Sequence, residues 1–282
     1  MTLSQEIKTL IKLALEEDIQ TGDITSTATV AESVKGRGFV KAKSKGIFCG
    51  CDVFTEVFRQ IDPNIRCAWN VQDGESLDAG QKCLSFEGSL RSILIAERTA
   101  LNFIQRLSGI ATLTNEFVSQ IRHTSAKIID TRKTTPLWRE LEKYAVRTGG
   151  GSNHRMGLYD MFLIKDNHIA AAGGMAPAIR SVITYKERSQ NRRPIEVETK
   201  NLAEVKEALQ FPIQRIMLDN MNVSEMREAV KLINRRCEVE ASGGVTLESV
   251  RAIAETGVDF ISVGSLTHSA PAMDLSLLIE TI

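Results

Sequence analysis

The chain has 282 residues, of which 43% are hydrophobic and 25% are charged, and it carries 35 basic and 35 acidic residues. This composition excludes a mainly disordered chain, and the length suits about two domains or one large barrel with an appendage. A formal net charge of zero gives the whole molecule no attraction for nucleic acid or for an anionic membrane, so any anion-binding site must be local.

The cysteine pattern and the first residues favour a cytoplasmic protein. Residues 1–18 include several acids and lack the apolar segment of a secretory signal. The longest nearly uncharged stretch, residues 169–179, is far shorter than the ~20 residues of a membrane span. Five cysteines without framework spacing indicate free thiols in a reducing compartment.

The first hundred residues mix helical and strand patterns. Ser4 is placed to cap a helix with an apolar face at a spacing of three and four residues, and Thr21-Gly22-Asp23 ends it. Further patterns predict strands at 39–43, 65–69 and 81–86, a helix at 53–61 and a long helix at 89–106. We therefore expect an N-terminal α+β sandwich domain over residues 1–101, completed by residues 269–282.

From there on, short apolar runs that end in polar residues alternate with amphipathic stretches. The runs cover 127–130, 161–165, 195–198, 216–219, 237–242 and 260–264. Helices are expected at 201–209, 224–233 and 246–256, with Asn201, Ser224 and Thr246 as their N-caps. This repeat is typical of a parallel α/β fold, and since no GxGxxG or GxxxxGK motif follows a strand, it predicts a closed α/β barrel over residues 102–268.

Reactive side chains stand at the ends of these predicted strands. The carboxyl ends of barrel strands meet at one mouth, so we expect them to face one cavity. They are Asp130, Arg132, Lys133, Lys165, Glu198, Asp219, Ser242 and Gly264. Each acid alone has a structural alternative as a helix cap, but six strands ending in this way favour an active site.

The same region has the residues of an anion site. Ser242-Gly243-Gly244 and Gly264-Ser265 follow the last two strands, where barrels bind phosphate through main-chain N–H groups, although these glycines alone also fit turns. Glu198 and Asp219 offer hard oxygen atoms for Mg²⁺ or for sugar hydroxyls. Cationic and imidazole side chains gather at Arg132, Lys133, Arg139, Arg147, His154, Arg155, Lys165 and His168, which indicates a ligand with several negative charges.

Several longer segments resemble quinolinate phosphoribosyltransferase, a family also called nicotinate-nucleotide pyrophosphorylase (carboxylating). They are EEDIQTGDITS (16–26), ERTALNFIQRLSGIAT (97–112), DTRKTTP (130–136), LEKYAVRTGGGSNHR (141–155), LIKDNHI (163–169), VETK (197–200), LDN (218–220), EASGG (240–244) and ISVGSLTHSAP (261–271). Their order and spacing cover nearly the whole chain. One departure is Leu137-Trp138, where the family usually has Gly-Leu.

The resemblance implies a type II phosphoribosyltransferase fold and a pentosyltransferase of NAD biosynthesis. Such an enzyme converts quinolinate and phosphoribosyl pyrophosphate into nicotinate mononucleotide, pyrophosphate and CO₂, with Mg²⁺ as cofactor. The carried-over catalytic residues are Lys133, Lys165, Glu198 and Asp219, and the last two would also hold the metal. The implied substrate-binding residues are these four together with Arg98, Thr131, Arg132, His154, Arg155, Ser242, Gly243, Gly244, Val263, Gly264, Ser265 and His268.

Arg98 owes its expected role to the resemblance alone. By periodicity it is an exposed helix residue that covers apolar surface. In the family, the matching arginine enters the neighbouring subunit's site, which implies a homodimer with shared active sites.

Alternatives of other classes remain at this point. One is a related enzyme with another base, such as a nicotinate phosphoribosyltransferase or the relative encoded with molybdate transporters. A second is a Schiff-base aldolase that uses Lys165. A third is a barrel that binds a nucleotide or sensor ligand without catalysis.

Overall fold

The structure is a computed structural model that describes residues 2–281, and its internal contacts divide the chain into two units. The first unit joins the stretch that ends at Asn115, Thr135–Gly150, and the stretch that begins at Ser269. The second consists of Glu116–Thr134 and Gly151–His268. The sequence analysis placed the domain boundary after residue 101, so it assigned residues 102–115 and 135–150 to the barrel, whereas both stretches belong to the first unit.

The first unit is built on an antiparallel sheet with strand order β12-β1-β5-β3. Along β1, exposed and buried residues alternate at first, as expected of a sheet with one face on the core. A two-stranded sheet pairs β2 with β4. The strands are β1 (Lys35–Ala42), β2 (Gly46–Ile47), β3 (Arg66–Trp69), β4 (Ser76–Leu77), β5 (Lys82–Ser89) and β12 (Leu275–Thr281).

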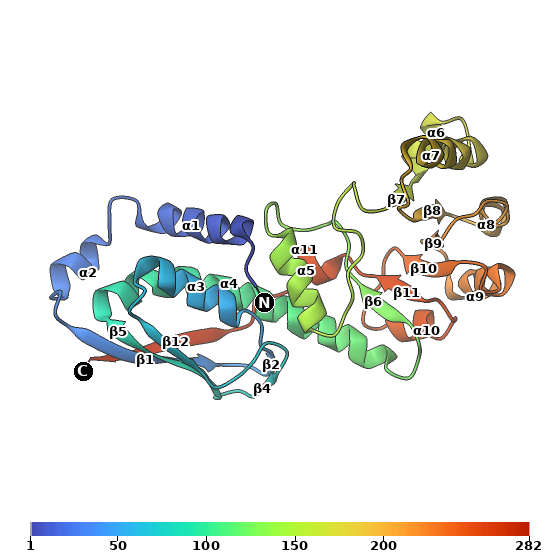
Figure 1. Ribbon diagram of the computed structural model, residues 1–282. Coiled ribbons are helices and arrows are strands. Elements are labelled where there is room, and N and C mark those ends of the chain that lie inside the picture. Colours follow the sequence, from blue (N-terminus) through green and yellow to red (C-terminus); the bar gives the residue numbers. More distant parts are fainter. Residues whose placement is uncertain (1, 282) are drawn as a thin grey trace. The chain divides into compact units, whose positions relative to one another are not determined.

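Helices cover one face of this sheet (Figure 1). They are α1 (Gln5–Ile19), α2 (Ile24–Thr29), α3 (Cys51–Ile61) and α4 (Leu90–Ile121), and the unit also contains α5 (Arg139–Thr148). The predicted cap of α1 is confirmed, since Ser4 Oγ accepts a hydrogen bond from the Ile7 amide. Aromatic rings fill the core, where Phe54 stacks on Phe58 with ring centroids 4.7 Å apart.

The second unit contains a six-stranded parallel sheet in the order β6-β11-β10-β9-β8-β7. Its strands are β6 (Lys127–Ile129), β7 (Phe162–Ile164), β8 (Ile195–Thr199), β9 (Arg215–Asp219), β10 (Glu238–Ser242) and β11 (Phe260–Ser262). Between and after them lie α6 (Asp166–Ala171), α7 (Met175–Ser189), α8 (Leu202–Ala208), α9 (Val223–Ile233), α10 (Val250–Ala254) and α11 (Ser265–His268). The predicted strands all form, and the parallel α/β architecture is confirmed.

The barrel is not closed by hydrogen bonds. Within residues 2–281, no ladder joins the edge strands β6 and β7, so closure is where the sequence prediction fails. A short irregular segment runs beside β6 instead. The Ser152 amide donates to the Ile128 carbonyl at 2.8 Å, and the Asp130 amide donates to the Ser152 carbonyl at 3.3 Å. This segment brings the residues that follow it, His154 and Arg155, to the interior of the unit.

Two of the three predicted helix caps in this unit need correction. Asn201 caps α8 as expected. Helix α9, however, starts after Asn222, which forms reciprocal hydrogen bonds with Glu225, so Ser224 lies inside the first turn. Thr246 bonds reciprocally with Ser249 in a turn, and α10 begins only after Ser249. Across residues 2–281, no helix is long and apolar enough to cross a membrane.

Candidate active site

A cavity of about 700 Å³ opens at the carboxyl ends of the strands of the second unit. All the substrate-binding residues that the resemblance implies for this unit line it, and they come from every strand end of the parallel sheet. They are Thr131, Arg132, Lys133, His154, Arg155, Lys165, Glu198, Asp219, Ser242, Gly243, Gly244, Val263, Gly264, Ser265 and His268. Arg98 is an exposed residue of α4 in the first unit.

Three other expectations about the cavity are corrected. Asp130 does not line it but is fully buried, where its Oδ1 accepts from the His154 amide at 2.9 Å and its other oxygen from the Asn153 side chain. It therefore holds the segment beside β6. Arg139 and Arg147 belong to α5 of the first unit and are not among the lining residues.

Two guanidinium groups give one side of the cavity its positive charge. Burial and the nearby charge of Arg132 lower the pKa of Arg155. Arg155 Nη1 donates to the Met161 carbonyl at 3.1 Å, which fixes part of its side chain. These like charges favour an anionic ligand, although Glu196 and Asp160 partly offset the charge of Arg155, and Lys165 also lines the cavity.

Two carboxylates form a second group of like charge. Burial and the neighbouring Asp219 raise the pKa of Glu198, while Lys165 opposes this shift. Glu198 is the penultimate residue of β8, and Asp219 is the last residue of β9, the adjacent strand. A cation at this point, whether a metal ion or a positively charged transition state, would relieve their repulsion.

Glycines allow close approach at two places on the rim. A Cβ on Gly243, whose φ is +96°, would lie 2.2 Å from Asn220 Oδ1. A Cβ on Gly264 would lie 3.2 Å from both His268 Nε2 and Lys133 Cδ. Thr267 Oγ1 also donates to the Lys133 carbonyl at 2.8 Å, so α11 holds the loop that carries Lys133.

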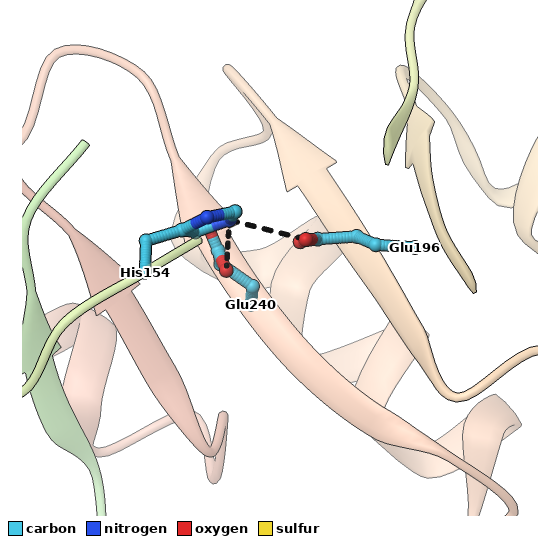
Figure 2. A group of neighbouring side chains, drawn as sticks. All are labelled: His154, Glu196 and Glu240. Atoms are coloured by element: carbon cyan, nitrogen blue, oxygen red, sulfur yellow. Dashed lines mark ion pairs between the residues drawn. The ribbon is translucent and has the colours of Figure 1, made fainter. Parts of the chain in front are cut away.

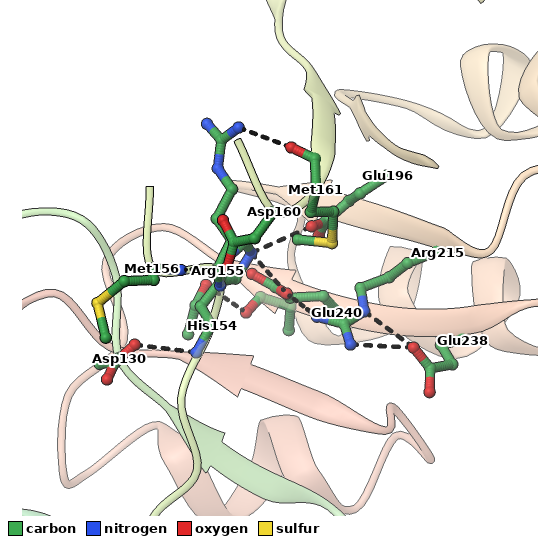
Figure 3. Close-up of polar contacts among 12 residues, drawn as sticks. Asp130, His154, Arg155, Met156, Asp160, Met161, Glu196, Arg215, Glu238 and Glu240 are labelled. Atoms are coloured by element: carbon green, nitrogen blue, oxygen red, sulfur yellow. Dashed lines mark hydrogen bonds and ion pairs between the residues drawn. The ribbon is translucent and has the colours of Figure 1, made fainter. Parts of the chain in front are cut away.

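Beneath the cavity lies a group that the sequence analysis missed, here called the buried network: His154, Glu196, Glu240 and Arg215. His154 Nε2 lies 3.1 Å from Glu196 Oε2 and 3.4 Å from Glu240 Oε2 (Figure 2). Arg215 Nη1 donates to Glu240 Oε2 at 3.1 Å, and its Nη2 donates to Glu238 at 2.9 Å (Figure 3). Both Glu196 and Glu240 are fully buried.

The charges in this network shift one another's pKa values. Burial opposes a charged His154, but the two carboxylates outweigh it and raise its pKa to about 9. Burial and the charge of Glu240 raise the pKa of Glu196 to about 7. Burial alone would raise the pKa of Glu240, but the contact with His154 and the charge of Arg215 outweigh burial and lower this pKa.

The buried network has ligand atoms suited to a metal ion but also has cations of its own. Among the described residues, His154, Glu196 and Glu240 are the one group of three whose ligand atoms lie within 4.8 Å of one another. The guanidinium of Arg215 already pairs with Glu240, so a metal ion there would face a positive charge. A sequence signal for the network did exist. The patterns Glu196-Val197-Glu198 and Glu238-Val239-Glu240 put two acids on one face of a strand.

Comparison with known proteins finds the same family in both units. Residues 23–108 match the family model "Quinolinate phosphoribosyl transferase, N-terminal domain" and residues 110–278 match the corresponding C-terminal domain. The chain belongs to the quinolinate phosphoribosyltransferase family. All the cavity residues lie within the C-terminal domain of this family and Arg98 within the N-terminal one.

Individual quinolinate phosphoribosyltransferases match over nearly their full length. Quinolinate phosphoribosyltransferase [decarboxylating] 1b of Nicotiana tabacum is 46% identical over 98% of this chain and 83% of its own. The probable nicotinate-nucleotide pyrophosphorylase [carboxylating] of Bacillus subtilis is 43% identical over 96% of this chain and 93% of its own. The solved nicotinate-nucleotide pyrophosphorylase of Francisella tularensis superimposes with a TM-score of 0.94 at 42% identity, covering 99% and 98%.

Proposed function

We propose that the cavity of the second unit transfers the phosphoribosyl group of phosphoribosyl pyrophosphate to quinolinate, giving nicotinate mononucleotide, pyrophosphate and CO₂. This is the activity in the names of the relatives. The observation that carries the proposal is the separation of charge within one cavity, with Arg132 and Arg155 at one place and Glu198 and Asp219 at another. The first pair suits a dicarboxylate, and the second suits a cationic ribose.

Quinolinate binds at the cationic side. Its two carboxylates pair with Arg132, Arg155 and Lys165, and a guanidinium can meet a carboxylate with two parallel hydrogen bonds. Thr131 and His154 complete this end. Held in this way, the ring nitrogen faces the ribose carbon that it attacks, which replaces a random encounter by a fixed geometry.

The phosphates of the other substrate bind at the glycine-containing rim. Lys133 and His268 supply positive charge and hydrogen-bond donors next to Gly264. The main-chain amides of Ser242–Gly244 and Val263–Ser265 supply further donors, since glycine lets an anion approach the backbone.

Departure of pyrophosphate leaves positive charge on the ribose, which the neighbouring carboxyl groups of Glu198 and Asp219 stabilise. The ring nitrogen then forms the bond to ribose and becomes a pyridinium. When the neighbouring carboxylate leaves as CO₂, the electron pair of the broken bond stays on the ring carbon beside this positive nitrogen, and that carbon takes up a proton. No covalent intermediate with the chain is needed.

Mg²⁺ fits the same two carboxylates. Their hard oxygen atoms, and their mutual repulsion as seen in the raised pKa of Glu198, suit a divalent cation. Mg²⁺ bound there would neutralise charge on the diphosphate of the substrate. Activity should therefore be lost on chelation and restored by added Mg²⁺.

The deciding experiment supplies phosphoribosyl pyrophosphate with quinolinate or with nicotinate and follows mononucleotide and CO₂. Product from quinolinate with equimolar CO₂ supports the proposal. Turnover of nicotinate instead would favour a related phosphoribosyltransferase of another base, and trapping of a carbonyl substrate by borohydride would favour the aldolase.

Lys165→Ala should lower quinolinate turnover by about a hundredfold or more, since it removes a charge-assisted contact to a substrate carboxylate. The matched control is Lys206→Ala, which removes an exposed lysine of α8 in the same unit. Steady-state assays of both variants, with melting curves to verify folding, make the comparison. Near-normal turnover of Lys165→Ala would remove this residue from the mechanism.

We further propose a homodimer in which Arg98 of one subunit completes the site of the other, and a cytoplasmic location. The exposure of Arg98 leaves it available for such a contact. The free cysteines fit a reducing compartment.

A further inference from the structure

We infer that Glu196 and Glu240 are positioning residues for the quinolinate end of the cavity. They bracket the Nε2–H of His154 and so hold the ring with its Nδ1 against the main-chain N–H of Arg155. This inference rests on the proposed function and extends it to residues that lie below the substrate. It also gives His154 a second role, as a support for the main chain of Arg155.

The buried network lies one layer below the substrate-facing residues. Side chains two apart on a strand share a face, so Glu196 lies beneath Glu198 on β8, and Glu240 beneath Ser242 on β10. Glu240 and His154 themselves line the cavity. The carboxylates are therefore close enough to act on the site through one intervening side chain.

The two nitrogens of the His154 ring have different neighbours within the chain. The Arg155 amide donates to Nδ1 at 2.7 Å, which requires an unprotonated Nδ1 and leaves the ring proton on Nε2. This contact opposes the second ring proton that the two carboxylates favour. Nε2 faces both carboxylates at ion-pair distance rather than forming an aligned hydrogen bond with one of them. Because both acids contact the same edge, they restrict rotation of the ring to either side.

This arrangement fixes the main chain that presents Arg155. The His154 amide donates to buried Asp130, and the next amide, that of Arg155, donates to the His154 ring. Two successive amides are thus held by side chains below the cavity. The phosphate end is supported separately, by the bond from Thr267 to the Lys133 carbonyl. A loosened His154 should therefore disturb quinolinate binding and spare the diphosphate end.

Arg215 explains how two acids are kept beneath an anion-binding cavity. Its guanidinium bridges Glu240 and Glu238 and lies 4.0 Å above the ring of Phe260. Buried carboxylates without a partner are costly and would repel a dicarboxylate, so the arginine offsets both effects. Glu238 is the outer, half-exposed partner of Arg215.

The test compares Glu196→Leu with Glu196→Gln, using Glu238→Gln as the control. Leucine fills a similar volume without a hydrogen-bond acceptor, whereas glutamine keeps one. With leucine, the KM for quinolinate should rise at least about tenfold, since the buried Nε2–H loses the nearer of its two facing carboxylates. The KM for phosphoribosyl pyrophosphate should stay within about twofold. Glutamine should restore most of the loss, and Glu238→Gln should behave like the unaltered chain.

An equal rise of both KM values, or an equal loss with glutamine and leucine, would overturn the inference. Circular dichroism verifies folding. If the leucine variant does not fold, ¹⁵N resonances of the histidines in the unaltered chain decide. The signal that disappears in His154→Asn should show a protonated Nε2, and a bare Nε2 with the proton on Nδ1 alone would refute the inference. If the unaltered chain does not turn over quinolinate, the proposed function is wrong. The ¹⁵N resonances would still show where the proton of His154 lies, so the two failures can be distinguished.

Discussion

Leu137 occupies the position at which the family resemblance predicts a glycine. Its φ is +67°, in the left-handed region that disfavours side chains, and the side chain is 83% exposed. Its neighbour Trp138 stacks on Phe103 with centroids 4.6 Å apart. The leucine therefore keeps the turn that glycine would form, at a cost in backbone energy and with little packing in return.

Leu137→Gly should be at least as stable as Leu137→Ala, because glycine removes the left-handed penalty of about 1 kcal/mol while alanine keeps it. Both variants lose the same exposed side chain, so alanine is the matched control. Urea unfolding of the three proteins measures the difference. A glycine variant clearly less stable than the alanine variant would show that chain entropy outweighs the turn strain.

Glu198→Gln and Asp219→Asn should reduce the chemical step more than substrate affinity. The carboxylates act on charge that develops as pyrophosphate leaves, so their contribution is greatest in the transition state. Single-turnover rates at saturating substrate, compared with binding measured by calorimetry, separate the two effects. Weakened binding with an unchanged single-turnover rate would make these acids ligands of the ground state only.

Strand ends predicted Lys165, Glu198 and Asp219 as cavity residues, because parallel topology brings these ends together. His154, which follows the irregular segment beside β6, stands at no strand end, and its role in the site was expected from the family resemblance. Sequence reasoning missed Glu196 and Glu240 because they stand before the strand ends, where apolar residues are the usual content of a barrel. The prediction that Asp130 faces the cavity was wrong for the opposite reason. Asp130 follows a strand end, but its oxygens bond to the segment beside β6 instead of facing the cavity.

Among the elements, the strands were predicted closely, but the long helix predicted at 89–106 continues to Ile121, and two of the helix caps were misplaced. The apolar period of α9 places its buried face but leaves the start uncertain by a turn. Asn222 rather than Ser224 caps α9, because Glu225 lies three residues after Asn222 and completes the reciprocal hydrogen bonds. The sequence also could not predict that the sheet is open, since no local pattern shows whether the edge strands β6 and β7 pair.

Asn222→Ala should destabilise the chain by about 1 kcal/mol, since the Glu225 amide at the start of α9 loses its side-chain acceptor. Ser224→Ala, an exposed change two residues away, should be neutral within about 0.5 kcal/mol. Thermal melts or urea titrations of both variants compare them directly. Equal effects would argue against Asn222 as the cap.

At the scale of the whole molecule, the proposed shared site can be tested by mixing inactive chains. Arg98→Ala and Lys165→Ala should each be inactive alone. A mixed dimer would contain one site with both residues intact, so statistical exchange of subunits should restore about a quarter of the original activity if the sites are independent.

Sedimentation and mass-tagged subunits check the exchange in this experiment. A monomer at the assay concentration, or no recovery after verified exchange, would reduce Arg98 to a solvated helix residue. Sequence periodicity could not decide this point, because a functional arginine and a solvated one look the same on the exposed face of α4.

The first unit is made from three separated parts of the chain, and its sheet includes β12 beside β1, paired from Gly36 with Thr281 to Ala42 with Leu275. During synthesis, β1 therefore waits for a partner that is about 240 residues later, a large sequence separation that slows productive folding. Until then, its unpaired edge is open to strands of other nascent chains. Expression of this protein should consequently depend on chaperones that shield the early chain more than on the stability of the finished fold.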